Sequence, residues 1–224
     1  MRLEAVCKRY GTEGPAVLDG VDLCVAEGEY VAIMGESGVG KSTLLNLLAG
    51  LDRADSGRIA LDGMDLGQLD DDALTLLRRR AVGFVFQAFH VLPYLTASQN
   101  VELPLELLGV PPAERRERVA RMLAAVGIEA LAERRPRELS GGEIQRIAIA
   151  RALVHGPRVL LADEPTGNLD PRSAAATLDL LREQVKSHGA AGILITHSLV
   201  AARTADRILT LDARGLAARP PDAA

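Results

Sequence analysis

The stretch Gly35–Thr43, GESGVGKST, decides the fold of this chain. It matches the pattern G-x-x-x-x-G-K-[ST], with glycine, lysine and serine at the fixed positions. An apolar, strand-like run, Tyr30–Met34, precedes it, and an apolar-periodic helix is expected over Thr43–Ala49. A strand, a glycine-rich loop and a helix in this order predict a phosphate-binding loop. The competing interpretation is a purely structural turn, since glycine-rich turns between strands and helices are common.

The residues of this loop suit phosphate chemistry. Gly38 and Gly40 lack Cβ atoms, so the backbone can turn sharply and present several N–H groups to phosphate oxygens. The N-terminus of the following helix adds partial positive charge. Lys41 is expected to reach the β- and γ-phosphates of ATP, and the Ser42 hydroxyl to bind Mg²⁺. The candidate ATP-binding residues of the loop are Gly35, Glu36, Ser37, Gly38, Val39, Gly40, Lys41, Ser42 and Thr43.

Composition sets limits on the class of protein. A chain of 224 residues suits one compact domain with a small insertion. Its hydrophobic content is 48%, but only 3% is aromatic and Trp is absent, so the core must be aliphatic. A net charge of −4 argues against a nucleic-acid binder that works by bulk charge. Cys7 and Cys24 lie in apolar surroundings without metal-like spacing, so reduced, buried thiols are expected.

The amino terminus, MRLEAVCKRYG, lacks the hydrophobic core of a signal peptide. No apolar run approaches the roughly 18 residues that a membrane-spanning helix needs. We therefore expect a cytoplasmic protein that meets a membrane only through a partner.

Apolar strand-like runs alternate with helical segments on either side of a mostly helical middle. These runs, at Tyr30–Met34, Val82–Gln87, Val159–Asp163 and Ile193–Thr196, predict a mostly parallel sheet covered on both faces. Short strands before the phosphate loop predict an N-terminal antiparallel β element. The expected fold class is α/β, a P-loop NTPase core with an inserted α-helical subdomain. Its single domain, 1–224, would divide into a catalytic core at 1–87 and 157–213, a helical subdomain at 88–156 and a flexible tail at 214–224.

Polar candidates stand at the ends of the predicted strands. In a parallel sheet, ligands bind beyond the carboxyl ends of the strands, so Lys41, Gln87, Asp163 and His197 are expected to converge. Asp163 closes the run VLLAD and is a candidate Mg²⁺ ligand, acting through water. Glu164 is the candidate general base that polarises the water attacking the γ-phosphate. For an arbitrary Asp-Glu pair, a solvated or capping role would be the simpler interpretation.

A second motif, LSGGE at 139–143, has two interpretations. Ser140 and Glu143 match the S-x-x-E capping box, so the motif could simply start a helix. That account leaves Gly141 and Gly142 unexplained, because glycine costs about 1 kcal/mol in a helix. Behind a serine at a helix N-terminus, they indicate a second anion-binding surface. Two copies arranged head to tail would use both surfaces, each closing over the ATP of the other.

With these motifs the chain resembles the ATP-binding cassette (ABC) family over nearly its full length. LSGGEIQRIAIARAL (139–153) is similar to the family's signature sequence, usually LSGGQ, and its helix. The resemblance implies that Ser140, Gly141, Gly142 and Glu143 contact the ATP of the opposite subunit. It implies further site residues: Tyr10 stacking on adenine, Gln87 as the Q-loop catalytic and Mg²⁺ residue, Asp170 in the D-loop and His197 as the catalytic switch histidine.

Two departures and two simpler interpretations accompany the resemblance. Glu143 stands where the family usually has Gln, and Ser198 replaces the acidic residue that often follows the switch histidine. A lone histidine at a strand end, such as His197, is more often a hydrogen-bonded structural residue. A tyrosine near the amino terminus, such as Tyr10, usually has only a packing role within the protein.

The amino-acid sequence of several stretches resembles that of the lipoprotein-release and macrolide-export branch of the family. These are GLDRADSG (50–57), FVFQAFHVLPYLTASQNVELPL (84–105) and ADEPTGNLD (162–170). The branch implies integral membrane permeases as partners, ATP-driven homodimers, and a peripheral position on the cytoplasmic face of the inner membrane. The alternative is a non-transport ATPase whose membrane partner regulates the cell envelope. A soluble repair or translation ATPase fits less well, because the chain has one cassette and only 99 positions separate Lys41 from Ser140.

The segment Ala88–Leu95 is unusually apolar for a loop. Its residues could pack the core of the helical subdomain, or they could line a groove, with Glu102, that receives a short cytoplasmic helix of the permease. The basic clusters at Arg78–Arg80, Arg115–Arg121 and Arg134–Arg137 are interleaved with Glu, so solvated helix faces are the simplest interpretation. Contact with anionic lipid head groups is the alternative.

Overall fold

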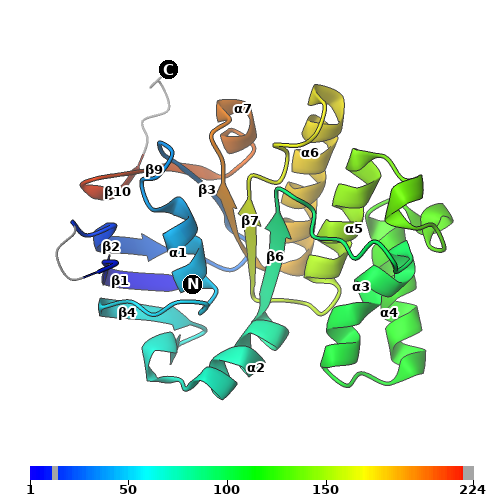
Figure 1. The fold of residues 1–224 in the computed structure, drawn as a ribbon, viewed down its shortest axis with the longest axis horizontal. Coiled ribbons are helices and arrows are strands. Elements are labelled where there is room, and N and C mark those ends of the chain that lie inside the picture. Colours follow the sequence, from blue (N-terminus) through cyan, green and yellow to red (C-terminus); the bar gives the residue numbers. More distant parts are fainter. Residues whose placement is uncertain (12–14, 219–224) are drawn as a thin grey trace.

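The computed structural model describes residues 1–11 and 15–218, and these residues form two sheets and a helical layer (Figure 1). A four-stranded antiparallel sheet has the order β2-β1-β4-β5. Its strands are β1 (Arg2–Lys8), β2 (Leu18–Cys24), β4 (Ser56–Leu61) and β5 (Met64–Asp65). A six-stranded sheet has the order β10-β9-β3-β8-β7-β6. Its strands are β3 (Tyr30–Met34), β6 (Val82–Phe86), β7 (Val159–Asp163), β8 (Ala191–Ile195), β9 (Arg207–Asp212) and β10 (Gly215–Ala218).

Strands β9, β3, β8, β7 and β6 run parallel, and β10 pairs antiparallel with β9. The α/β class, the parallel sheet and the N-terminal antiparallel element are therefore confirmed. The longer helices are α1 (Lys41–Leu48), α2 (Asp71–Ala81), α3 (Ala97–Leu107), α4 (Pro112–Ala125), α5 (Gly141–Leu153) and α6 (Pro171–His188). The shorter ones are η1 (Leu66–Gln68), η2 (Glu129–Leu131), η3 (Pro136–Glu138) and α7 (Leu199–Ala202). In Figure 1, α3, α4 and α5 gather at one end of the molecule, far from the antiparallel sheet.

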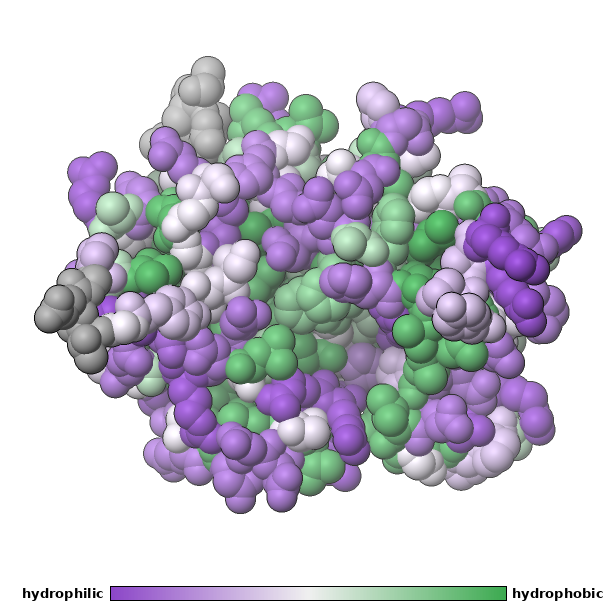
Figure 2. Space-filling model, in the orientation of Figure 1, coloured by the Kyte–Doolittle hydropathy of each residue, from purple (hydrophilic) through white to green (hydrophobic). Residues whose placement is uncertain are grey.

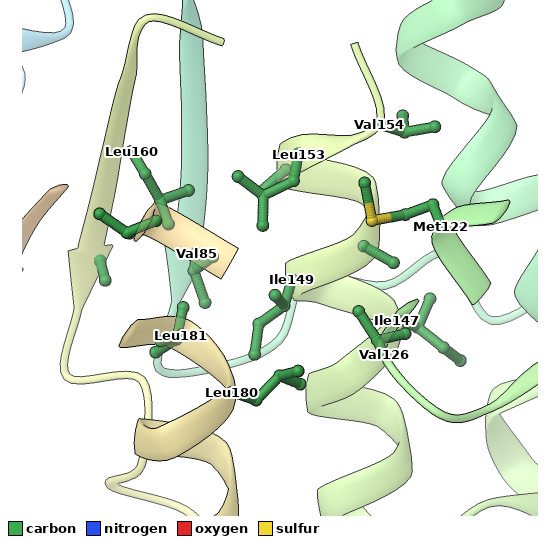
Figure 3. Close-up of a cluster of buried hydrophobic side chains, with 14 of the residues drawn as sticks. Val85, Met122, Val126, Ile147, Ile149, Leu153, Val154, Leu160, Leu180 and Leu181 are labelled. Carbon is green, nitrogen blue, oxygen red and sulfur yellow. The ribbon is translucent and has the colours of Figure 1, made fainter. Parts of the chain in front are cut away.

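Successive side chains of the buried strands point to opposite faces of the sheet, so the hydrophobic core consists of two clusters. In β3, Val31 and Ile33 join a cluster with α1 and the antiparallel sheet, whereas Tyr30 and Ala32 join a cluster with α3 to α6. The second cluster brings Leu153 of α5 and other aliphatic side chains of α5 and α6 against the sheet (Figure 3). Both faces of the parallel sheet are thus covered, and both cores are almost wholly aliphatic.

Side chains at the helix starts explain where several helices begin. Thr96 accepts a hydrogen bond from Gln99 N at 3.2 Å, and Gln99 Oε1 accepts one from Thr96 N at 2.9 Å, so α3 begins with a full capping box. Ser140 caps α5 in the same way. The helix after the phosphate loop starts two residues earlier than predicted, at Lys41, because Gly40 in a left-handed conformation serves as its N-cap.

Two expectations are wrong. The predicted tail, 214–224, begins with a strand, because Gly215–Ala218 pairs with β9 through backbone groups that need no particular side chain. Residues 219–224 of that tail lie outside the described residues. The cysteines are not buried as predicted: Cys7 is half-buried, and Cys24 is exposed because it falls on the outward positions of β2. No helix among the described residues has the length and apolar character needed to cross a membrane.

Candidate active site

The register of the parallel strands aligns four chain segments at one edge of the sheet. Phe86 pairs with Asp163, and Asp163 and Ile33 both pair with Ile195. The residues that follow these positions therefore leave the sheet side by side. They are the phosphate loop after β3, Gln87 after β6, Glu164 after β7, and Thr196 with His197 after β8.

A cavity of about 470 Å³ lies at this edge. It is lined by Tyr10, Val17, Ser37, Gly38, Gly40, Lys41, Ser42, Thr43, Gln87, Asp163, Glu164 and His197. The expected convergence of Lys41, Gln87, Asp163 and His197 therefore appears in the structure. Gly35, Glu36 and Val39 line a neighbouring cavity of about 600 Å³, and His197 borders both. Of the described residues around the 470 Å³ cavity, none belongs to the 139–143 motif.

The phosphate loop has the backbone that its glycines predict. Gly38 and Gly40 have φ values of +82° and +109°, a region that other residues rarely adopt. A Cβ on Gly40 would also lie 2.9 Å from the Val17 carbonyl oxygen. Lys41 Nζ donates to the carbonyl oxygens of Gly35 at 2.8 Å and Glu36 at 2.7 Å. Burial lowers the pKa of Lys41, and the nearby carboxylates of Glu164 and Asp163 oppose that shift.

The two carboxylates at the end of β7 have different surroundings. Burial raises the pKa of Asp163, while Lys41 and His197 pull it down. Glu164 has φ +44°, an unusual backbone conformation for a glutamate. Its Oε1 accepts a hydrogen bond from His197 N at 2.7 Å, and its Oε2 accepts one from the Thr196 hydroxyl at 3.2 Å. The loop after β8 therefore fixes both carboxylate oxygens of Glu164.

His197 and Gln87 are tied to neighbouring loops. His197 Nε2 lies 3.7 Å from Glu164 Oε1, and the imidazole is half exposed. The Gln87 carbonyl oxygen accepts a hydrogen bond from Asn168 Nδ2 at 2.9 Å. A Cβ on Gly167 would lie 2.7 Å from Gln87 Nε2, so the 167–168 turn packs closely on the Gln87 side chain. The sequence alone could not reveal that Asn168 bonds to Gln87 or that Thr196 bonds to Glu164. The residues of the first pair are 81 positions apart, and those of the second pair are 32 positions apart.

Tyr10 stands at the rim of the cavity with 53% of its surface exposed. Its hydroxyl donates to Asp52 Oδ2 at 2.7 Å, and Lys8 Nζ donates to Asp52 Oδ1 at 2.7 Å. The same ammonium lies 5.1 Å from the centre of the Tyr10 ring. Lys8 and Asp52 thus hold the ring in place, and sequence reasoning found neither, since 44 residues separate them.

The 139–143 motif and Asp170 occupy a separate surface. Ser140 is exposed at the start of α5, and the motif packs against the turn before α6, where Leu169 lies 3.4 Å from the position of a Cβ on Gly141. A Cβ on Gly142 would lie 3.2 Å from the Ser173 hydroxyl. Asp170 accepts hydrogen bonds from the backbone N–H groups of Arg172 and Ser173, both at 3.1 Å, and so caps α6.

The donor set at the cavity suits Mg²⁺. Ser42, Gln87 and Asp163 offer a hydroxyl, an amide and a carboxylate, and oxygen ligands of this kind are those that Mg²⁺ takes. The half-buried Asp163 is close enough to Lys41 for their charges to interact. The chemistry of these residues therefore fits a hydrated divalent cation.

Comparison with known proteins assigns the family. A family model described as "ABC transporter" matches residues 18–167. The chain therefore belongs to the ABC transporter family. It is 47% identical over 213 residues to the macrolide export ATP-binding/permease protein MacB of Brucella abortus (strain 2308), covering 94% of this chain and 33% of that protein. Against MacB of Nitrosomonas europaea it is 46% identical over 214 residues, covering 94% of this chain and 32% of that protein.

The chain thus spans about a third of the length of these curated relatives. Among solved structures, it is similar to the dimeric structure of MJ0796, a bacterial ABC transporter cassette. The two are 40% identical, with a TM-score of 0.83 and coverage of 96% of this chain and 95% of that one. The same figures hold for the MJ0796 dimer described as a post-hydrolysis state bound to ADP and Pi. The ABC ATPase fold and the resemblance to macrolide exporters are confirmed.

The Lys8–Asp52 pair gives a stability prediction. Asp52→Ala should lower the free energy of unfolding by about 2 kcal/mol, because Lys8, only 11% exposed, loses a charged partner. Burial would raise the pKa of Asp52, but the hydrogen bonds from Lys8 and other donors hold it below its usual value. The contribution of the Lys8–Asp52 pair to the free energy of unfolding should therefore be present above about pH 4 and be lost as the pH falls below that value.

Denaturant unfolding of both the wild type and the variant measures this loss. Glu117→Ala is the matched control, since it removes a carboxylate from an ion pair that is 70% and 69% exposed. The control should change stability by less than about 0.5 kcal/mol. Equal effects of the two substitutions would show that burial adds nothing to the Lys8–Asp52 interaction.

Proposed function

We propose that this chain is the ATP-hydrolysing subunit of an ABC transporter of the export type and works as a head-to-tail, ATP-bound homodimer coupled to a membrane permease. The observation that carries the proposal is the cavity at the sheet edge, where the phosphate loop, Asp163, Glu164 and His197 meet. The likeness to MacB and to the dimeric MJ0796 cassette supports it. We include in this proposal that the transporter is of the export or lipoprotein-release type.

In this proposal the residues of the cavity have separate roles in ATP binding and hydrolysis. The loop N–H groups and Lys41 bind the phosphates, with Lys41 exchanging the two carbonyl oxygens it now contacts for phosphate oxygens. Ser42, Gln87 and Asp163 would hold Mg²⁺, whose positive charge would offset the negative charge on the phosphates. Tyr10 stacks on the adenine. Glu164 accepts a proton from the water that attacks the γ-phosphate, giving ADP and phosphate, and His197 contacts the γ-phosphate.

The separation of the 139–143 motif from the cavity supports sharing between two subunits. Ser140 is exposed at a helix N-terminus, which favours anions, yet the motif lines no part of the 470 Å³ cavity in the described chain. A second copy placed head to tail brings this motif over the phosphates of the first. Residues Ser140 to Glu143 then complete each site in trans.

The surface between the core and the helical layer supports a permease contact. A groove of about 350 Å³ runs between α2 with β6 and α3 with α5, and Figure 2 shows apolar side chains gathered around this hollow. Phe84, Phe86, Leu103 and Leu107 contribute apolar surface to it. Three arginines also line the groove, and their positive charge suits an amphipathic helix that carries acidic groups: Arg78, Arg79 and Arg151.

This groove differs in its lining from the one predicted. Leu92 and Tyr94 are 45% and 87% exposed, as a contact surface requires, but they do not line it. Glu102 faces a separate pocket and pairs with Arg115 at 2.7 Å. Val91 packs against the core, as the alternative interpretation expected. We therefore propose that the permease helix occupies the 350 Å³ groove, and that Leu92 and Tyr94 are exposed contact residues outside its lining.

Glu164→Gln tests the assignment of the general base. The variant should bind Mg-ATP normally but lose at least about a hundredfold in turnover, because the amide cannot accept the proton from water. It should also accumulate as an ATP-bound dimer. Steady-state phosphate release and gel filtration with Mg-ATP measure both. Near-normal phosphate release would remove Glu164 from the role of base.

Mixing two inactive variants tests sharing in trans. Lys41→Ala removes phosphate contacts, and Ser140→Arg blocks closure over the opposite nucleotide. A heterodimer of the two has one site with both defects and one intact site, so mixing should restore ATPase activity. If both motifs served the ATP of one chain, the heterodimer would have no intact site, and mixing would recover nothing.

The docking groove predicts a loss of partner binding without a loss of folding. Leu107 is 61% exposed, so Leu107→Glu should leave the melting temperature nearly unchanged while it removes co-purification with the integral membrane partner. Tyr94→Glu should weaken that contact with equally little effect on folding. Leu76→Glu, at a position 50% exposed on α2 outside the groove lining, is the control. Retention of the partner by Leu107→Glu would exclude the groove as its docking site.

A further inference from the structure

The serine at the start of α5 is hydrogen-bonded to a carboxylate three residues later. Ser140 N and the Ser140 hydroxyl both donate to Glu143 Oε2, each at 2.7 Å. Glu143 N donates to the Ser140 hydroxyl oxygen at the longer distance of 3.4 Å. A serine hydroxyl has a single hydrogen to donate. In this structure that hydrogen is therefore committed to Glu143 and not directed outward from the helix start.

The helix α3 shows what a neutral side chain does at the same position. There Gln99 Oε1 accepts from the Thr96 backbone N–H at 2.9 Å, and Thr96 accepts from Gln99 N at 3.2 Å. These two bonds complete the capping box with an amide in place of a carboxylate. A carboxylate is thus not required at position 143 to cap α5, because an amide can make the same two bonds. What it adds is a third bond, a charge-assisted one to the hydroxyl, and a negative charge.

The charge is maintained at neutral pH. The hydrogen bonds from the backbone and side chain of Ser140, with a contribution from Arg146, lower the pKa of Glu143, and burial opposes them only in part. An ionised carboxylate therefore sits beside the hydroxyl at a helix N-terminus, a place that otherwise favours anions. An incoming phosphate meets both a hydroxyl that already has an acceptor and a like charge.

We propose that Glu143 restrains ATP-driven pairing of two copies by holding the Ser140 hydroxyl, so that the γ-phosphate of the opposite copy must displace the carboxylate before the site closes. The inference rests on the proposed function, since it assumes that Ser140 meets the ATP of a second copy. Glu143 is a positioning residue in this scheme, because it acts through Ser140. Its effect is to raise the ATP concentration that the dimer requires and to favour reopening.

Glu143→Gln in the Glu164→Gln background tests the restraint without hydrolysis. Gln can keep the capping box, as Gln99 does, but as an uncharged acceptor it holds the hydroxyl less strongly. The ATP concentration at half-maximal dimer, measured by analytical ultracentrifugation, should fall about threefold to tenfold. Glu138→Gln is the matched control, because it removes the same charge from the turn just before the motif, where Glu138 also caps a helix start. It should leave the midpoint unchanged.

A second pair of variants separates the hydrogen bond from simple charge repulsion. Once Ser140→Ala has removed the hydroxyl, Glu143→Gln should shift the midpoint much less, because only the charge repulsion remains. An undiminished shift in that background would overturn the restraint on Ser140, and so would an unchanged midpoint with Ser140 present. Absence of any ATP-dependent dimer in the Glu164→Gln parent would instead contradict the proposed function itself. Thermal melts of each variant verify that α5 remains folded.

Discussion

The parallel pairing of β6, β7, β8 and β3 is the constraint on which the rest of the site depends. Because Phe86, Asp163, Ile195 and Ile33 lie in register, the loops that follow them begin at the same edge of the sheet. Residues more than a hundred positions apart in the chain are thereby brought around one cavity. A slip of one residue in any of these strands would turn its side chains to the opposite face and remove its loop from the site.

The loops at that edge are also tied to one another and to the helical layer. Asn168 holds the carbonyl of Gln87, and Arg151 of α5 donates to the carbonyl oxygens of Phe89 and His90 at 3.2 and 2.7 Å. Phe89 and His90 both have positive φ values, +59° and +49°, which are unusual for such residues. The segment after β6 is thus held in a constrained conformation by α5. These bonds join the segment that follows Gln87 to α5, the helix that begins at the 139–143 motif.

Much of the site could be predicted because its residues are marked by local patterns. Lys41 and Ser42 follow a fixed glycine spacing, and Asp163 and Glu164 directly follow an apolar strand, so the cavity lining was accessible from the sequence. The partners that hold these side chains were not. Thr196, Asn168, Lys8 and Asp52 act across the fold, and their positions depend on strand register that no local pattern encodes. The strand at Gly215–Ala218 was missed for a different reason: its pairing with the adjacent strand β9 is local, but it uses only backbone groups and needs no particular side chain.

Four side chains of the proposed mechanism already have a hydrogen-bond partner within the protein. Lys41 is bound to two loop carbonyls, Glu164 to Thr196 and His197, Tyr10 to Asp52, and Ser140 to Glu143. Nucleotide binding must therefore exchange hydrogen bonds, and the net free energy of each exchange is far smaller than that of the bond itself. Such a site can close and reopen, because the internal partners recover their bonds when the phosphate leaves. A cycle of pairing and separation requires this balance, and a carboxylate such as Glu143 shifts it toward the separated state.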